Sequence, residues 1–226
     1  MRTDKDLLLE TGDKIVAYTR AAESAVKILF EDENILVADK PKGVESEAFF
    51  EKLKEGRELY FVHRLDRNTD GILVFAKTRE AKKELVFGFK NRAFEKYYLA
   101  EVYGSFEKKS GTLTDYLVKD AEKAEVKIYK TPVNGSVKIV TRYKTLKESG
   151  GTSLIEVELV TGKTHQIRAH LAFYGHFVIG DGKYGKESIN RLYKAKKQRL
   201  SAVKIVFHFG GGALSYLDGK TIERKN

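Results

Sequence analysis

The chain has 226 residues, of which 42% are hydrophobic and 33% charged, so it suits one globular domain, or a domain with a small appendage. It has no cysteine, which excludes disulfides and thiolate chemistry. Its net charge of +10 favours a polyanionic partner such as nucleic acid, although a lysine-rich surface that only serves solubility fits equally well. No apolar stretch is long enough to span a membrane and no signal peptide opens the chain, so we expect a soluble, cytoplasmic protein.

The predicted elements are mostly strands. We place residues 1–25 in an N-terminal tail and residues 26–226 in one domain. Apolar or alternating runs predict strands at 26–30, 35–38, 60–62, 72–77, 94–103, 112–117, 125–129, 137–146, 153–160 and 203–209. Helical spacing appears at 79–89 and at 163–174, the second with Thr161 near its N-cap. Strands and helices do not alternate regularly, so the pattern predicts an α+β fold with a largely antiparallel or mixed sheet and few flanking helices.

The most informative segment is Val62–Gly71, which places the carboxylate of Asp66 among cationic side chains. Asp, Asn, Thr and Gly together predict a tight turn, and the apolar run that follows at 72–76 predicts a buried strand. Asp66 should therefore lie on a loop held by a rigid strand, where functional side chains are often placed. These ten residues alone also fit an ordinary polar turn with an incidental ion pair.

Three further segments remove that ambiguity. They are Lys40-Pro41-Lys42-Gly43, Lys96-Tyr97-Tyr98-Leu99-Ala100, and the run from Leu159 to Leu171 that continues through Gly180-Asp181 and Tyr184-Gly185. Together with His63-Arg64-Leu65-Asp66, and in this order along the chain, they resemble the signature motifs of the RluA-type pseudouridine synthases. The resemblance covers roughly residues 26–207 and implies the pseudouridine synthase fold in the domain that begins at residue 26. In front of it, Gly12-Asp13-Lys14-Ile15 resembles the end of a small RNA-binding domain that many relatives carry, although a basic tail fits equally well.

The resemblance also implies an activity, an isomerase reaction in which uridine in RNA becomes its C-glycoside isomer. The base leaves the ribose, rotates and reattaches through carbon, so neither a redox cofactor nor a metal is needed. Asp66 matches the family's nucleophile, Arg168 the arginine that pairs with it, and Tyr98 the active-site tyrosine. An ionised carboxylate in a dry pocket is costly unless a cation is near, and a planar guanidinium holds it in one orientation. We therefore expect Arg168 to meet Asp66, and the ring of Tyr98, but not that of Tyr97 on the opposite face of the strand, to stack on the uracil.

RNA contacts are expected around these three residues. Base flipping costs a few kcal/mol, and Arg64 matches the family's arginine that can fill the vacated stack. His63 is expected to support the loop or to contact a phosphate. The remaining candidates for RNA binding are Lys40, Lys163, His165 and Gln166.

Other chemistries fit the sequence less well. Gly162-Lys163-Thr164 resembles the end of a phosphate-binding P-loop, but Val157 stands where that loop needs a glycine. His165 and His170 are five residues apart and would point about 140° apart on a helix, so zinc binding is not expected. Gly210-Gly211-Gly212 lacks the spacing of a dinucleotide-binding loop.

Departures from the family motifs concern the target more than the chemistry. Asp70 stands where the family usually has serine, and it would either fold back towards Asp66 or face water. The segment Gly180–Asn190 resembles members that modify large-subunit ribosomal RNA, so 23S ribosomal RNA is the first expectation and tRNA the alternative. A non-catalytic RNA-binding or ribosome-assembly protein on the same fold is a further alternative. We expect the protein to act as a monomer.

Overall fold

A computed structural model describes residues 26–120 and 122–224, and the predicted N-terminal tail lies outside them. Within these residues eleven strands form one mixed sheet in the order β1-β2-β4-β10-β5-β9-β8-β6-β7, with β3 paired to β4 and β11 paired to β10. Every pair is antiparallel except β4 with β10. The strands are β1 Ile28–Glu31, β2 Ile35–Lys40, β3 Tyr60–Phe61, β4 Asp70–Ala76, β5 Phe94–Tyr103, β6 Ser110–Asp120, β7 Glu125–Tyr129, β8 Val137–Ser149, β9 Thr152–Leu159, β10 Leu200–Phe207 and β11 Thr221–Glu223.

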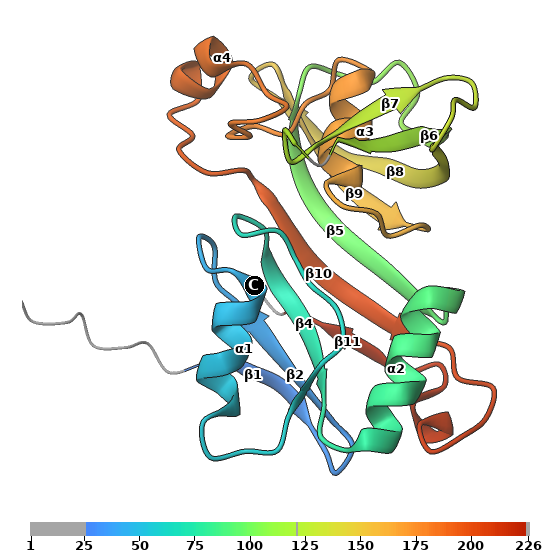
Figure 1. Cartoon of the computed structure of the whole chain (residues 1–226). Helices are drawn as coiled ribbons and strands as arrows, with labels where there is room; N and C mark the ends of the chain where they lie inside the picture. Colours follow the sequence, from blue (N-terminus) through green and yellow to red (C-terminus); the bar gives the residue numbers. More distant parts are fainter. Residues whose placement is uncertain (1–25, 121, 225–226) are drawn as a thin grey trace, which may run out of the picture.

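Few helices accompany the sheet, as expected for an α+β protein. They are α1 Ser46–Lys54, α2 Arg79–Asn91, α3 Gln166–Phe173, α4 Glu187–Leu192 and one 3-10 turn, Ser215–Leu217. Figure 1 shows α1 and α2 beside the half of the sheet that contains β1, β2 and β4, and α3 and α4 at the other end. No helix in the described part of the chain is long and apolar enough to cross a membrane.

The two halves of the sheet meet where β10 lies between β4 and β5. Its parallel contact with β4 is short and pairs Ser201 with Asp70 and Ala202 with Gly71. Gly71 has a φ of +110°, and a Cβ there would lie 2.0 Å from the carbonyl oxygen of Ala202. Only glycine permits so close a backbone approach, so the residue after Asp70 is fixed by the junction itself.

Aromatic packing stabilises the half of the sheet beside the Asp66 loop. Strand β4 is buried along its whole length, and Phe75 stacks on Phe50 of α1 with ring centroids 5.7 Å apart. Phe49 and Phe61 pack against the same ring at 6.3 and 6.4 Å. Burying such a side chain contributes about 1.5–3 kcal/mol, so this aromatic cluster gives the Asp66 loop, which leads into β4, a rigid base.

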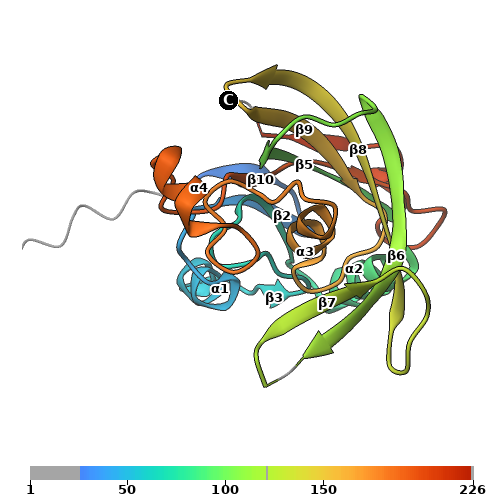
Figure 2. The ribbon, with the colours of Figure 1, turned by 90° about the horizontal axis from the view of Figure 1, so that it is seen from above.

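The other half of the sheet curves around α3 (Figure 2). The first six residues of α3, Gln166–Leu171, are all buried. His170 is fully buried and bonds Asp115 of β6 through Nε2 at 2.9 Å and Thr141 of β8 through Nδ1 at 2.9 Å. These polar bonds anchor α3 to the strands on which it packs.

Most predicted strands are confirmed, and β5 and β7 begin and end where the alternation predicted. Sequence reasoning missed α1, although Phe49, Phe50 and Leu53 share its buried face, and it also missed α4 and β11. Helix α3 begins at Gln166 rather than at 163, and its N-cap is His165 in a left-handed conformation. The expected cap from Thr161 is therefore wrong; its hydroxyl bonds the side chain of Gln166 instead, at 2.9 Å.

Candidate active site

The loop that carries Asp66 is held from both sides. The Ser46 hydroxyl of α1 accepts the backbone N–H of Leu65 and donates to its carbonyl oxygen, both at 2.9 Å. The N–H of Thr69 bonds the carbonyl of Asp66 at 3.0 Å, which closes the predicted turn. The Thr69 hydroxyl in turn accepts a bond from the side chain of Gln198. Asp66 is therefore presented by a backbone with little freedom, as a reacting group requires.

Lys40 supports this loop from beneath instead of reaching outward. It is fully buried, and its ammonium donates to the carbonyl oxygens of Pro41, Val44 and Arg67 at 3.0, 2.7 and 3.2 Å. Burial lowers the pKa of Lys40 to about 8, and the nearby carboxylates of Asp70 and Asp66 partly oppose that shift. Lys40 was expected from the sequence among the RNA-binding residues, but in the structure its ammonium closes the loop.

Helix α3 brings Arg168 to Asp66 across 102 residues of chain. The Nη1 of Arg168 donates to Oδ2 of Asp66 at 2.8 Å. Arg168 is 8% exposed, and the side chain of Asp66 is 24% exposed, so the pair lies at the edge of solvent. A guanidinium that bonds a carboxylate at this distance fixes its orientation.

Asp181 holds the other side of the same guanidinium. Its two oxygens accept Nε at 2.7 Å and Nη2 at 2.9 Å, and one of them also accepts the N–H groups of Lys183 and Tyr184. Burial opposes the charge on Arg168, but the bonds and attraction to Asp181, with a further contribution from Asp66, raise its pKa above the ordinary value. Asp181 is almost fully buried, yet Arg168 and the two N–H groups lower its pKa. Arg168 is thus clamped between two carboxylates of different exposure.

His165 lies beside this cluster. Its left-handed backbone, with φ +53°, points the ring towards Asp66, and Nε2 lies 4.0 Å from Oδ1. Its Nδ1 is 2.9 Å from the hydroxyl of Tyr184, which also accepts the N–H of Val126 at 3.0 Å. Burial lowers the pKa of His165, and attraction to Asp66 only partly offsets the shift, so the ring is neutral at neutral pH. Tyr184 also places its ring 5.2 Å from the guanidinium carbon of Arg168.

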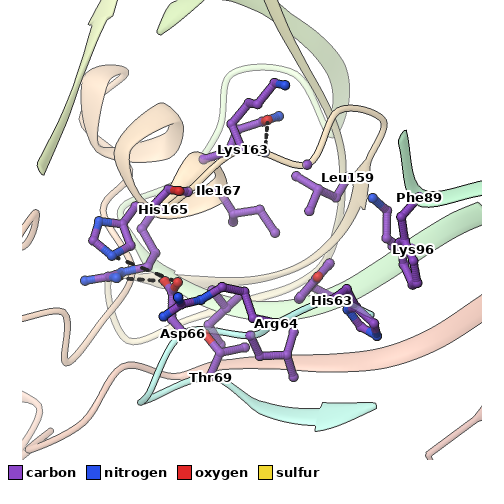
Figure 3. Close-up of a pocket in the computed structure, with 17 residues that line it drawn as sticks. His63, Arg64, Asp66, Thr69, Phe89, Lys96, Leu159, Lys163, His165 and Ile167 are labelled. Carbon is purple, nitrogen blue, oxygen red and sulfur yellow. Dashed lines mark hydrogen bonds and ion pairs between the residues drawn. The ribbon is translucent and has the colours of Figure 1, made fainter. Parts of the chain in front are cut away.

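Asp66, His165 and Arg168 line a cavity of about 390 Å³, which we call the Asp66 cavity (Figure 3). Eight of the nine residues predicted for the site line it, and Lys40 is the exception. Tyr98 lies in its wall and is 8% exposed; burial first, and then the charge of Asp66, raise the pKa of its phenol above the ordinary value. The size suits one small ligand or one nucleotide unit, within the range of about 300–1,000 Å³ typical of ligand pockets.

The predicted RNA-contact residues differ in what they offer. Arg64 and Lys163 are exposed at the cavity, although Arg64 pairs with Glu47 at 2.9 Å. Gln166 is 2% exposed, and its side chain bonds Thr161, Thr141, the carbonyl of Val140 and the N–H of Lys163. These bonds use both ends of its amide, so the structure gives it a supporting place rather than the RNA contact expected.

His63 supports the loop, one of its two expected roles. Its Nε2 accepts the N–H of Val74 at 2.9 Å, and its ring stacks on Phe89 at 4.2 Å. Burial, and then the charge of Lys96, lower its pKa to about 3, so the ring stays neutral.

Comparison with known proteins now identifies the family. The model for RNA pseudouridylate synthases matches residues 34–173. The chain belongs to the RNA pseudouridylate synthase family. An uncharacterized RNA pseudouridine synthase of Mycoplasma genitalium is 36% identical over 205 residues, 80% of this chain and 63% of that protein. Ribosomal large subunit pseudouridine synthase C of Vibrio vulnificus is 32% identical over 194 residues, 77% and 60% of the two chains.

Solved structures agree on the fold. The human protein titled RNA Pseudouridylate Synthase Domain Containing 1 superposes with a TM-score of 0.77 at 21% identity, covering 92% of this chain and 86% of that one. The human Domain Containing 4 protein gives 0.71 at 23% identity and 88% of each chain. The predicted pseudouridine synthase fold is confirmed. The chain spans only about six-tenths of the length of the curated relatives above.

Two features of this family member were not foreseen. Asp70 neither folds back towards Asp66 nor faces water: it is 9% exposed and bonds Ser201 at 2.6 Å and Arg224 at 2.7 Å. Burial opposes its charge, but these partners and Lys42 lower its pKa, so its charge is neutralised locally.

Asp181 and Tyr184 were quoted as motif residues but were given no role. Their loop has no periodicity, so nothing in the sequence indicated which of its side chains faces Arg168. No cluster of three or more His, Cys, Asp or Glu side chains suited to a metal exists among residues 26–120 and 122–224.

Proposed function

We propose that this protein converts uridine to pseudouridine in RNA. The observation that carries the proposal is the 2.8 Å contact between Asp66 and Arg168 at the edge of a cavity that also exposes Tyr98. In the reaction the bond from C1′ to N1 breaks and a bond from C1′ to C5 forms. The C5 proton leaves and N1 gains one, so the atoms balance without an oxidant or a second substrate.

In the proposed mechanism Asp66 supplies the electron pair that starts the reaction. Arg168 holds the carboxylate in one orientation, and Asp181 stops the guanidinium from rotating away. Tyr98 offers its ring to the flipped base, since nucleobases stack on aromatic side chains. Arg64 fills the place of the flipped base. To do so its exposed guanidinium must leave Glu47, which costs little because surface ion pairs are worth only about 0–1 kcal/mol.

Tritium release tests the activity. RNA from cells that lack this protein, labelled with [5-³H]uridine, should lose tritium to water when wild-type protein is added. Asp66→Asn, which keeps the shape but removes the charge, should release none. Asp218→Asn is the matched control, because Asp218 is exposed and does not line the cavity. Equal release by wild type and Asp66→Asn would defeat the assignment of the nucleophile. If the wild type binds the RNA but releases nothing, the non-catalytic RNA-binding alternative holds.

The proposed target is large-subunit ribosomal RNA. Support comes from the name of the Vibrio relative and from the Gly180–Asn190 segment, which resembles members that modify this RNA and whose Asp181 bonds Arg168. Fractionating the labelled RNA before the assay separates ribosomal RNA from tRNA. Tritium released only from the tRNA fraction would replace this target with the alternative one. Action in the cytoplasm and as a monomer are parts of the same proposal, and native mass spectrometry tests the second.

A further inference from the structure

One lysine in the Asp66 cavity has no place in the mechanism above. Lys96 lies on β5, two residues before Tyr98, so both side chains leave the same face of the strand about 7 Å apart. It lines the cavity, and Figure 3 shows it with Phe89 at the side opposite Asp66 and His165. Its ammonium makes no hydrogen bond or ion pair with any group in the described ranges.

The surroundings of Lys96 explain why it stays unpaired. Beside it, His63 accepts the Val74 N–H through Nε2, so the neutral ring carries its proton on Nδ1 and offers no acceptor. Burial lowers the pKa of Lys96 to about 8, and the positive charge of Arg92 adds to the effect. Lys96 is only partly exposed, so its charge is partly desolvated at a cost, whereas the buried Lys40 has three carbonyl partners.

Gly162 shows that room is kept for this ammonium. A Cβ at Gly162 would lie 3.1 Å from Nζ of Lys96, tighter than nine in ten real contacts, and Gly162 has no left-handed φ that would otherwise require glycine. The lysine head thus lies against bare backbone at the end of the cavity. Leu159 and Phe89 give that end apolar walls, which suit a flat ring better than a solvated phosphate.

We propose that Lys96 is a catalytic residue that donates a hydrogen bond to a carbonyl oxygen of the flipped uracil and stabilises negative charge there. This rests on the proposed function. When the sugar carbon lies at Asp66, a base that follows the wall of Tyr98 points its far edge towards Lys96. If the carboxylate of Asp66 attacks C1′ with its electron pair, the electrons of the C1′–N1 bond pass to the uracil ring and spread over O2 and O4. If the carboxylate attacks C6 instead, the negative charge reaches O4. In both routes a cation at the place of Lys96 stabilises the charge on the carbonyl oxygen.

The test uses Lys96→Met, which removes the charge but keeps the length, and Lys96→Arg, which keeps the charge. Tritium release from the total labelled RNA is followed in single turnover over a range of enzyme concentrations. This separates the rate constant at saturation from the half-saturating concentration. Lys147→Met is the matched control, because Lys147 is an exposed lysine of β8 outside the cavity, and it should change neither value.

For Lys96→Met we expect the saturating rate constant to fall about 10- to 150-fold, the loss of one hydrogen bond to a charged group. The half-saturating concentration should stay within threefold, and Lys96→Arg should recover part of the rate. An unchanged rate constant overturns the proposal. So does a large rise in half-saturating concentration alone, which would assign Lys96 to a phosphate.

Thermal melting keeps the test independent of folding defects. Lys96→Met removes an unpaired, desolvated charge, so its Tm should equal or exceed that of the wild type. Lys40→Met should lower it, because three carbonyl oxygens lose their donor. If wild type is active, Asp66→Asn inactive and Lys96→Met unchanged, only this inference fails; if the wild type is inactive, the proposed function fails first.

Discussion

Replacement of Arg168 by lysine separates positive charge from geometry at the centre of the site. The guanidinium makes three bonds of 2.7–2.9 Å, two to Asp181 and one to Asp66. An ammonium is a point donor and cannot form this fork. Asp181 has no exposed side-chain surface, so its charge needs compensation more than that of Asp66, and the lysine head should remain with Asp181.

Asp66 would then lose its partner. A hydrogen bond to a charged group is worth about 1.5–3 kcal/mol, and about 1.4 kcal/mol is a factor of ten in rate. Arg168→Lys should therefore turn over about 10- to 150-fold more slowly in single-turnover tritium release. RNA affinity, measured by filter binding in the same buffer, should stay within about threefold, because the charge is kept.

The loss of one bond to Asp181 also lowers stability, by about 1–3 kcal/mol, which is a Tm fall of roughly 2–12 °C for a chain of this size. Arg142→Lys is the matched control, since Arg142 is exposed on β8 and its Nη1 makes one bond, to Glu158 of β9. A folded Arg168→Lys protein with wild-type turnover would refute the idea that orientation, rather than charge, is what Arg168 supplies.

Three further outcomes are expected. Gly71→Ala forces a Cβ to within 2.0 Å of the Ala202 carbonyl, so it should destabilise the β4–β10 junction by about 2–6 kcal/mol in urea unfolding, while Gly210→Ala, which meets nothing within 4 Å, should not. RNA affinity should fall steeply with salt. Each phosphate contact adds about −0.7 to −0.9 to the slope of log binding constant against log salt concentration, and an affinity that does not change with salt would show that the net charge is incidental. The pKa of Asp181 is lowered in the folded state, so the ionised carboxylate stabilises the fold above about pH 4, and this contribution is lost as the pH falls further. The Tm of Asp181→Asn should therefore depend less on acid pH than that of the wild type. An equal dependence would contradict a stabilising role for this carboxylate.

Local patterns predicted the strands well because alternation is a local property. Strands β5 and β7 have the predicted bounds, and β4 is the continuous apolar run that followed the Asp66 turn. The order of strands was not accessible, since nothing in the residues around 200–207 indicates that they lie between β4 and β5. The contact of Asp66 with Arg168 was predicted by the resemblance and not by spacing, because no periodicity relates residues 102 positions apart.

Burial limited what the sequence could show about three polar residues near the site. Lys40 and Gln166 were expected at RNA because they stand in segments that resemble the family's motifs. Both are buried, and satisfy backbone groups that loops and a helix start leave unpaired. Asp181 was missed because the sequence of an irregular loop does not indicate that its carboxylate bonds a guanidinium.

The place of β10 has a consequence for how the molecule assembles. The strand at the middle of the sheet is translated after almost all of its neighbours, so the segments before it can form only two separate β-blocks with open inner edges. Contacts of such long sequence separation slow folding and leave strand edges exposed to other chains for longer. The nascent polypeptide should thus need chaperones until roughly its two-hundredth residue emerges, and refolding from denaturant should be slow and sensitive to protein concentration.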